Sequence, residues 1–517
     1  AIVLPTGIGF FDSFFGALLV GAVPVPLYPP VRLGRLDEYA AKTGAMLTSV
    51  DAVTVVLDKR VRRVFGLVLS HCALSLGLLD VTALSTGKSM VNLGEPDDLA
   101  MIQFSSGTTN QPKPVALTHR AVLSNVDAIL GAVLPLCDPA YPPTGVSWLP
   151  LYHDMGLIGC IFPALSHGAK LALLPPEVFL LRPALWLRAL SRHRAVVSPA
   201  PNFAYSLATA RIEDTELEGV DLSSWRFAMN GAEAVSPNHL RAFQARFAAW
   251  GLAKNALCPV YGLAEASLAV TFSSPHRPFT AHHFDRFLLA QGQAVPTLER
   301  GSAAVELASV GSALPGFSVA VRDKAGQPVA EGTVGDLWVA GPSLLKGYVN
   351  DTPSPVQDGW LETGDLAFLW ADELYITGRA KDIVVIRGRN HAPQELEMAT
   401  DNVEGVRQGC AVAVSHIGNE GEELYLFVEV REARVGQAGE ITQAVMAGTG
   451  VSPTQVLLLA PGTIPRTSSG KLRRQETLKR AIAGELLAPN KVTPVRILGA
   501  MARSKWAELK RPTGDPS

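Results

Sequence analysis

A chain of 517 residues is too long for one compact core and is long enough for two or three domains. Apolar residues make up 48% of it and charged residues 18%, which is a globular composition and excludes a disordered chain. The formal net charge of -2 excludes the global basic field of nucleic-acid-binding proteins, so we expect no nucleic-acid partner.

The most apolar stretch lies at residues 14–27 and is interrupted by Pro24 and Pro26. It is shorter than the roughly 20 residues that span a bilayer, and it predicts a buried helix followed by a buried strand, with no membrane span. Five scattered cysteines without a CxxC pair are typical of reduced thiols in a cytoplasmic protein and argue against a zinc site. The chain starts at Ala1, close to this apolar stretch, and no signal peptide is visible, so we expect the N-terminus to be cut from a longer protein.

Residues 1–380 alternate short apolar runs with loops and helical stretches. An apolar run at 195–198 precedes a loop with prolines and a helical stretch, and a run at 225–229 leads to a helical pattern at 237–250. Such units predict a mostly parallel sheet covered by helices. In sheets of this kind, ligands bind beyond the carboxyl ends of the strands.

The pattern changes after this region. Short alternating runs at 319–321 and 337–339, separated by turns with Gly and Pro, predict an antiparallel β subdomain over 309–350. The end of the chain, 487–517, carries Pro, Lys and Arg without clear packing and indicates a tail or linker.

Residues 381–486 have the composition of a small α+β domain. The elements expected in it are a strand at 383–387, a helix from Pro393, strands near 411–414 and 424–430, and a closing helix after Gly470.

Residues 104–113 have the sequence FSSGTTNQPK and follow an apolar run at 100–102. Small hydroxyl residues and glycine allow backbone N–H groups to turn toward phosphate oxygens, and the lysine adds positive charge. A Ser/Thr/Gly loop alone is usually only a turn, but the Pro-Lys pair at this spacing favours a nucleotide phosphate loop. The residues assigned to it are Ser105, Ser106, Gly107, Thr108, Thr109 and Lys113.

Further motifs follow in a fixed order. They are WLP at 148–150, HDMG at 153–156, NGAE at 230–233, YGLAE at 261–265, TGD at 363–365, GRAKD at 378–382 and PRTSSGK at 465–471. In this order and spacing the chain resembles, from residue 1 to about 485, the adenylate-forming superfamily of acyl-CoA ligases, luciferases and adenylation domains. HDMGLIG at 153–159, NGAE, RGRNH at 387–391 and the run at 465–474 are most similar to the fatty acyl-AMP ligases.

The resemblance implies an α/β fold. A large N-terminal domain of parallel-sheet α/β units with the β subdomain, residues 1–380, would be followed by a small mobile α+β C-terminal domain, residues 381–486. An extra stretch at 276–308 resembles the insertion that marks fatty acyl-AMP ligases and is associated with failure to use free coenzyme A. An ordinary surface loop is the alternative. His282 and His283 within it have no nearby partner set, so we expect no metal site there.

The resemblance also implies a reaction, in which a fatty acid is joined to AMP and pyrophosphate leaves, with ATP and Mg²⁺ as cofactors. Both reactants are anionic, so catalysis is mostly charge neutralisation and alignment. Lys471 would be the mobile catalytic lysine that bridges the acid's carboxylate and the α-phosphate. Glu265 would hold Mg²⁺, and His153, beside Asp154, would line or gate the acyl pocket.

Other residues are assigned by the resemblance to the nucleotide and the hinge. Asp365 would accept hydrogen bonds from the ribose hydroxyls, and Arg379 would reach the ribose or a phosphate. Lys381 matches the hinge at which the small domain would rotate after adenylation. The residues assigned to the adenine slot are Gly231, Ala232, Glu233, Tyr261 and Gly262, with the tyrosine stacking on the base.

Three positions depart from the family pattern. Asn110 and Pro114 stand where glycine is usual, and Ala392 replaces a common aromatic residue. Asparagine tolerates left-handed backbone geometry, whereas proline fixes φ and removes an N–H donor, which would weaken phosphate binding.

Four functions compete at this point. The first is a fatty acyl-AMP ligase that passes its acyl group to the phosphopantetheine thiol of a holo acyl carrier protein or of a polyketide or peptide synthase carrier domain. The second is an acyl-CoA ligase that uses free coenzyme A. An amino-acid adenylation domain would need an acidic pocket residue, and none is evident at 202–205 or around Gly231. A non-catalytic nucleotide- or acyl-binding module is the fourth, motivated by Asn110 and Pro114.

Overall fold

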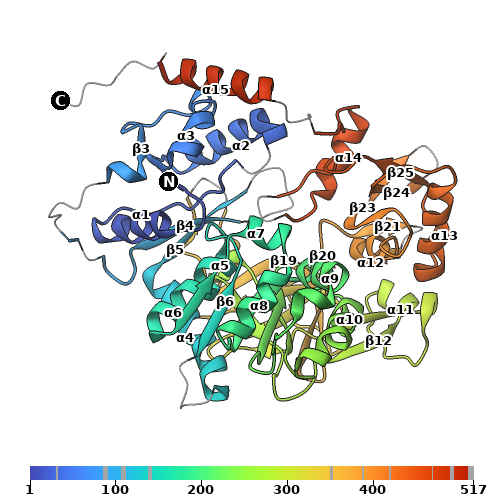
Figure 1. Cartoon of the computed structure of the whole chain (residues 1–517). Coiled ribbons are helices and arrows are strands. Elements are labelled where there is room, and N and C mark those ends of the chain that lie inside the picture. The colour runs from blue at the N-terminus through green and yellow to red at the C-terminus, as the bar shows by residue number, and fades with distance from the viewer. Residues whose placement is uncertain are drawn as a thin grey trace.

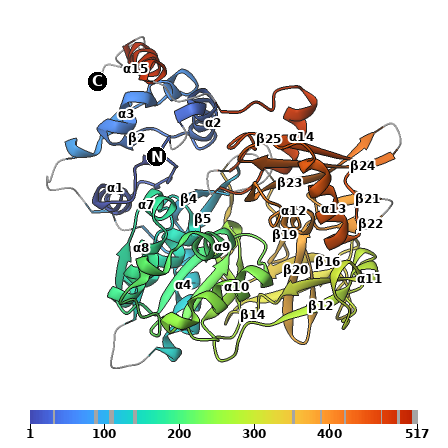
Figure 2. The same ribbon diagram turned by 45° about the vertical axis from the view of Figure 1, so that its right-hand side comes forward.

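The computed structural model describes residues 1–30, 33–84, 91–92, 94–105, 112–137, 143–349, 353–386, 389–418, 421–467, 470–489 and 494–509. A large N-terminal lobe carries a smaller C-terminal lobe on one side, and the last helix returns to the N-terminal lobe beside α2 and α3 (Figure 1). Turning the molecule shows the C-terminal lobe stacked over β19, β20 and α11 (Figure 2).

A seven-stranded sheet forms the centre of the large lobe, and its order is β14-β11-β10-β9-β8-β6-β7. The five strands from β10 to β7 are parallel, β11 pairs antiparallel with β10, and β14 pairs antiparallel with β11, so the predicted mostly parallel sheet is confirmed. Its strands are β6 (Thr144–Ser147), β7 (Lys170–Leu173), β8 (Val197–Pro201), β9 (Phe227–Gly231), β10 (Leu257–Gly262), β11 (Ala269–Phe272) and β14 (Ser312–Ala313).

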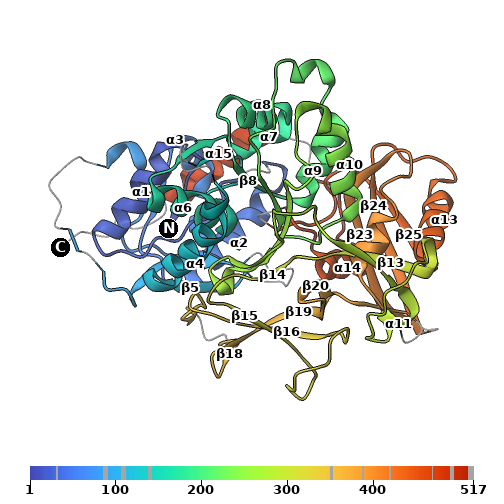
Figure 3. The ribbon, with the colours of Figure 1, turned by 90° about the horizontal axis from the view of Figure 1, so that it is seen from below.

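Helices cover both faces of this sheet (Figure 3). Phe227 and Met229 of β9 belong to one buried cluster, whereas Ala228 between them belongs to another, because successive side chains of a strand point to opposite faces. The first cluster includes residues of α4, and the second includes residues of α8, α9 and α10. The helices are α4 (His119–Val133), α6 (Phe162–His167), α7 (Pro176–Leu181), α8 (Ala184–Arg192), α9 (Asn202–Arg211) and α10 (Pro237–Phe247).

The N-terminal residues build a second, three-stranded parallel sheet of β1 (Ile2–Val3), β2 (Val55–Leu57) and β3 (Leu78–Asp80), flanked by α1 (Ile8–Leu19), α2 (Leu36–Ser49) and α3 (Lys59–Phe65). The prediction for 14–27 is correct for the helix and wrong for the strand. Within described residues 20–30, Pro26 makes only a β-bridge to Ile2, since Pro24 and Pro26 have no N–H to donate. The described helices include none that is long and apolar enough to cross a membrane.

The expected antiparallel strands are present after residue 310. β15 (Ser318–Arg322), β16 (Gly335–Ala340), β18 (Val356–Gln357), β19 (Trp360–Trp370) and β20 (Glu373–Arg379) form one antiparallel sheet, which continues past residue 350. The stretch 276–308 folds onto it as a hairpin with a helix: β12 (Ala281–Asp285), α11 (Arg286–Ala290) and β13 (Ala304–Ala308). Phe284 is fully buried against Phe368 and Tyr375, so this stretch is more than a solvated loop.

The C-terminal lobe has the predicted α+β pattern. Its elements are β21 (Val384–Ile386), β22 (Arg389–His391), α12 (Pro393–Met398), β23 (Val406–Gly418), β24 (Gly421–Val430), α13 (Gln437–Thr449), β25 (Gln455–Leu459) and α14 (Arg474–Ile482).

The expectation of an unpacked tail is wrong for α15 (Pro494–Leu509), which packs on α3. Ala500 and Ser504 are 3% and 1% exposed. A Cβ at Gly66 would lie 2.1 Å from the Ser504 carbonyl oxygen, so the close approach depends on glycine there. The tail sequence alone did not show where small residues of α15 would find such a surface.

Candidate active site

One cavity of about 410 Å³ brings together side chains that are far apart in the sequence. It opens beyond the carboxyl ends of β8, β9 and β10, and β19, β20 and the C-terminal lobe complete its walls. The predicted site residues that line it are Ser105, Lys113, His153, Ala232, Tyr261, Gly262, Glu265, Arg379, Lys381 and Lys471.

The floor is made by the ends of β9 and β10. A Cβ at Gly262 would lie 1.9 Å from the Leu268 carbonyl oxygen, so only glycine allows the chain to turn back there. Gly231 is buried beneath the surface of the cavity rather than lining it. Glu233 is exposed outside the lining residues, and its Oε1 accepts a hydrogen bond from the Phe203 backbone N–H at 2.6 Å. Of the predicted adenine group, Ala232, Tyr261 and Gly262 face the cavity.

Two residues from different parts of the chain bind the buried Asp365 carboxylate. The Tyr261 hydroxyl donates to Oδ2 at 2.7 Å, and the Arg379 Nε lies 3.1 Å from Oδ1. Asp365 and Arg379 are direct partners in the β19–β20 register, which sets this pairing. The nearby Asp365 charge raises the pKa of Arg379, and burial together with Asp365 raises the pKa of Tyr261. Tyr261 and Arg379 line the cavity, and Asp365, which is buried and is not among the lining residues, binds both of them from behind.

Glu265 follows β10 in a short 3-10 helix, Ala264–Ala266, and accepts a hydrogen bond from the Tyr348 hydroxyl at 3.1 Å. The Lys113 ammonium lies 4.7 Å from the centre of the Tyr348 ring. Burial raises the pKa of Glu265, so a cation beside its carboxylate would be favourable. Tyr348, in β17 (Gly347–Tyr348), was not predicted as a site residue, because a lone tyrosine in an unremarkable strand carries no signal.

Glu265 suits Mg²⁺, which usually takes one or two carboxylates and completes its shell with water and substrate phosphates. The part of the chain that the structure describes contains no group of three or more His, Cys, Asp or Glu side chains placed to hold a metal by themselves. The cysteines are free. Cys160 lies beside the Met155 carbonyl, and burial raises the pKa of its thiol to about 12.

His153 caps the first turn of α5 (Asp154–Gly156), and its Nδ1 lies 2.5 Å from Asp154 Oδ1. Burial acts to raise the pKa of Asp154, but His153 and Lys471 outweigh it and the pKa is lowered. A π-helical turn, Leu157–Ile161, follows at once and carries Gly159 into the cavity lining. Such turns are frequent at functional sites.

The C-terminal lobe contributes Lys471 to the same cavity. Its loop is a tight turn: the Lys471 N–H donates to Thr467 Oγ1 at 3.0 Å, and the Thr467 N–H donates to the Lys471 carbonyl at 2.8 Å. Gly470, with φ of +90°, allows that turn. Burial and the Arg379 charge lower the pKa of Lys471, while Asp154, Glu233 and Asp365 act against that shift.

Several predicted residues remain outside this description. Ser106, Gly107, Thr108, Thr109 and Asn110 lie outside the described residues, as do Arg387 and Gly388. The two ends of the predicted phosphate loop are described: the Ser105 N–H donates to the Lys113 carbonyl at 2.9 Å. Pro114 begins β5 (Pro114–Thr118) opposite Phe104 of β4 (Leu99–Phe104), and its carbonyl accepts a hydrogen bond from the Val349 N–H at 3.0 Å.

Lys381 lies at the rim, exposed, in the turn after β20. Next to it, Asp382 accepts from the Arg474 guanidinium at 3.2 Å, and Glu397 of α12 binds the same guanidinium with both oxygens at 2.7 Å. These three side chains are each less than a tenth exposed. The pair of carboxylates was not foreseen, since nothing local in the sequence links 382, 397 and 474.

Comparison with known proteins gives one consistent result. The AMP-binding enzyme family profile matches residues 1–349. The 4-hydroxyphenylalkanoate adenylyltransferase of Mycobacterium bovis is 33% identical over 94% of this chain and 82% of its own length. The long-chain-fatty-acid--AMP ligase FadD26 of Mycobacterium marinum is 34% identical over 93% of this chain and 86% of its own. A solved structure from a study of fatty acyl-adenylate ligases from E. coli and L. pneumophila is 34% identical and superposes with a TM-score of 0.86 over 93% of this chain and 88% of that one.

Proposed function

The chain belongs to the AMP-binding enzyme family and is an adenylate-forming ligase of the fatty acyl-AMP type. From that membership we propose its substrate and its mechanism. It activates a fatty acid with ATP, forming fatty acyl-AMP and pyrophosphate. The acyl group then passes to the phosphopantetheine thiol of a carrier protein or carrier domain, and AMP leaves.

The observation that carries the proposal is the position of Lys471. Its side chain lines the cavity that also holds Glu265, Tyr261 and Arg379, although it comes from the other lobe. An amine there can contact both the acid's carboxylate and the α-phosphate as negative charge increases during attack. Electrostatic stabilisation of this kind is usually the largest single contribution to the rate.

The remaining polar residues have complementary places in this scheme. The carboxylate oxygen attacks the α-phosphorus, the bond to the β-phosphate oxygen breaks, and pyrophosphate carries the electrons away. Ser105 and Lys113, at the ends of the phosphate loop, would hold the β- and γ-phosphates. Glu265 would hold Mg²⁺, which neutralises phosphate charge when bound. Asp365 and Arg379 would orient the ribose.

The acid end of the cavity favours an alkyl chain. Its lining is apolar and combines residues of α4, the π-helical turn, β9, β10 and β11. Among the described residues, the polar side chains that line the cavity are Ser105, Lys113, His153, Asp154, Tyr261, Glu265, Lys324, Asp336, Tyr348, Glu362, Thr363, Arg379, Lys381 and Lys471. A 4-hydroxyphenyl group, the kind that one relative's name specifies, would find no hydrogen-bond partner for its hydroxyl among the described apolar lining residues. The apolar lining residues are Ile129, Met155, Gly159, Pro199, Met229, Val260, Leu263, Leu268, Ala269 and Phe272.

The proposed transfer of the acyl group to a carrier thiol is supported by the stretch 276–308 and by the position of Lys381. The stretch 276–308 resembles the insertion of fatty acyl-AMP ligases, and its Arg286 binds Glu395 and the Gly448 carbonyl of the C-terminal lobe. Lys381, in the turn between the lobes, is the proposed hinge that would admit the second substrate after adenylation. Free coenzyme A is the competing acceptor.

The test combines pyrophosphate release with mass spectrometry of the products. ATP, Mg²⁺ and mixed-length fatty acids, with 4-hydroxyphenylalkanoates as a second set, should give acyl-AMP from the alkyl acids. Holo carrier protein should then receive the acyl group, and free coenzyme A should not. Efficient acyl-CoA formation would overturn the acceptor assignment, and a folded protein silent toward both acid sets would overturn the activity.

A further inference from the structure

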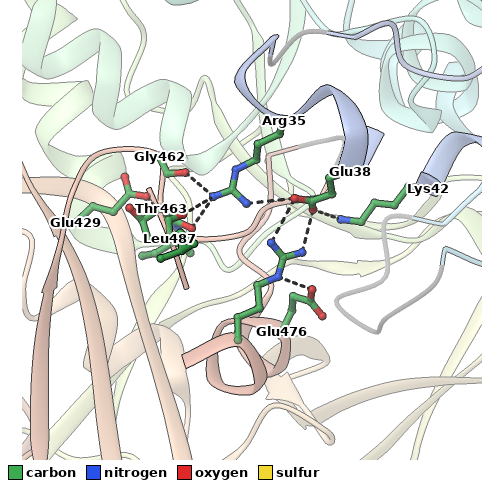
Figure 4. Close-up of polar contacts among 10 residues, drawn as sticks. Arg35, Glu38, Lys42, Glu429, Gly462, Thr463, Glu476 and Leu487 are labelled. Carbon is green, nitrogen blue, oxygen red and sulfur yellow. Dashed lines mark hydrogen bonds and ion pairs between the residues drawn. The ribbon is translucent and has the colours of Figure 1, made fainter. Parts of the chain in front are cut away.

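A polar cluster joins the N-terminal helix α2 to the C-terminal lobe (Figure 4), and its residues are not among those that line the cavity. Glu38 of α2 accepts two hydrogen bonds from the Arg480 guanidinium of α14, at 3.1 and 3.3 Å. Lys42 donates to the same carboxylate at 2.6 Å and Arg35 at 3.2 Å. Arg480 is held in turn by Glu476 at 2.7 Å. The Glu38 side chain is 28% exposed and that of Arg480 is 19% exposed, so this contact is partly shielded from water.

Arg35 also donates hydrogen bonds to backbone carbonyls of the C-terminal lobe. One of its terminal nitrogens, Nη2, donates to the carbonyls of Thr463 at 3.0 Å, Gly462 at 3.2 Å and Leu487 at 3.3 Å. The side chain of Arg35 is only 16% exposed. Three backbone acceptors and one carboxylate therefore converge on a single residue of the large lobe.

These contacts flank the segment that carries the proposed catalytic lysine. Gly462 and Thr463 precede Lys471 in the chain, and Arg480 follows it. Described residues of the segment between them also make hydrogen bonds of their own. The Ile464 N–H donates to Glu429 of β24 at 2.9 Å, and Arg466 donates to the Gly470 carbonyl at 2.7 Å. A segment whose two ends are both bound to the large lobe can bring Lys471 into the cavity from only a narrow range of directions.

We propose that Arg35, Glu38 and Arg480 are positioning residues that hold the C-terminal lobe in the orientation in which Lys471 reaches the cavity. The inference rests on the proposed function, since it assumes that Lys471 acts in adenylation. None of the three residues lines the cavity, so they act on the reaction only through the lobe.

The charge state of Glu38 agrees with this role. Burial acts to raise the pKa of its carboxyl, but the hydrogen bonds from Arg480 and Lys42 hold the pKa well below its usual range. Glu38 is therefore ionised at any pH at which the protein would be assayed, and the contact persists. If the lobe rotates after adenylation, the contact between Glu38 and Arg480 must break and form again in each cycle.

The experiment compares Glu38→Gln and Arg480→Gln with matched neighbours on the same helices. Asp37→Asn makes the same carboxylate-to-amide change one residue earlier, at an exposed side chain paired with Arg503 of α15. Lys479→Gln removes an exposed charge beside Arg480. For all four, pyrophosphate release is measured with the fatty acid that the wild-type chain uses best, together with thermal unfolding and hydrogen exchange.

We expect kcat for adenylation to fall by about threefold to tenfold in both test variants, which is the size of a lost, partly shielded ion pair. The KM of ATP should stay close to the wild-type value. Hydrogen exchange should quicken at 462–473 while the central sheet and the melting temperature stay unchanged. The double variant should be no slower than the slower single variant, because both changes remove the same contact.

Two results would overturn the inference. One is equal kcat values in the test variants and in Asp37→Asn and Lys479→Gln. The other is a fall in kcat that is accompanied by faster exchange throughout the molecule, which would mean general destabilisation. Lys471→Ala in the same assay separates this inference from the proposed function: if that variant keeps full activity, the role of Lys471 is wrong whatever Glu38 does.

Discussion

Asp365 and Arg379 face each other across two antiparallel strands, with Nε and Oδ1 3.1 Å apart, and Tyr261 reaches the other carboxylate oxygen from the central sheet. Removing the carboxylate charge leaves a guanidinium and a buried hydroxyl without their ionic acceptor. Such losses cost about 1.5–3 kcal/mol per charged hydrogen bond.

We therefore expect Asp365→Asn to lower kcat/KM for ATP by about tenfold to a hundredfold, with most of the change in KM. Pyrophosphate release at varied ATP concentration measures it. Glu373→Gln makes the same change at the other end of the β19–β20 hairpin, where Glu373 pairs with Arg277, and should leave KM for ATP unaltered. Equal KM values in both variants would contradict the assignment of Asp365 to the ribose.

Lys471→Met keeps most of the side-chain volume and removes the ammonium group. We expect kcat to fall by about 10²–10³, the usual cost of losing one preorganised electrostatic contact to a transition state. Adenylation measured by pyrophosphate release is the readout, and Lys479→Met is the control on the exposed face of α14.

The lowered pKa of Lys471 gives a pH dependence with a definite sign. The Lys471 side chain acts as a cation, so kcat/KM should fall as the pH rises through its pKa. In a plot of kcat/KM against pH, this fall on the alkaline side should come below the ordinary lysine pKa of about 10.4. Lys471→Arg should move this fall to higher pH, because guanidinium stays charged. If kcat/KM of the arginine variant falls at the same pH as that of the wild type, a group other than Lys471 causes the fall.

Gly159 should limit the width of the acyl end of the cavity. A Cβ at this position would lie 2.8 Å from Leu268 Cδ2, so Gly159→Val must intrude on the lining. We expect the variant to lose activity with longer fatty acids first, which a chain-length series measured by mass spectrometry would show. Gly131→Val, in α4 with no atom within 4 Å of its added Cβ, is the control. An unchanged chain-length profile would place the acyl chain elsewhere.

Arg474 is buried with both Glu397 and Asp382, so its removal leaves two carboxylates without their cation. We expect Arg474→Met to destabilise the C-terminal lobe by about 3–5 kcal/mol, as is typical when one partner of a buried ion pair is deleted. The loss of stability is measured by unfolding in urea, with hydrogen exchange of residues 406–430 as the signal from the C-terminal lobe. Arg434→Met, whose ion pairs to Glu404 and Glu440 are exposed, should change stability by less than about 1 kcal/mol.

Much of the site was predictable because its chemistry is local in the sequence. A Gly-containing turn at the end of an apolar run, with a charged or aromatic residue beside it, identifies a strand end where a ligand can bind. Tyr261 and Glu265 lie at or just after the end of such a strand, and the central parallel sheet followed from the repeated units. The roles expected of Tyr261, Glu265 and Asp365 came from the resemblance of their motifs to the adenylate-forming superfamily. Residues without a local pattern, such as Tyr348, could not be found in this way.

Short-range patterns in the amino-acid sequence by themselves predicted the mostly parallel sheet and the elements of the C-terminal lobe, because such patterns specify local structure. The reaction and the residues proposed for it came from the resemblance of the motifs to the adenylate-forming superfamily. Only the tertiary structure decided which lobe-to-lobe contacts hold Lys471 in place, that α15 packs against Gly66, and that Arg474 joins Glu397 to Asp382. Those relationships pair residues from distant parts of the chain, and their energies depend on distance and burial, which no local pattern contains.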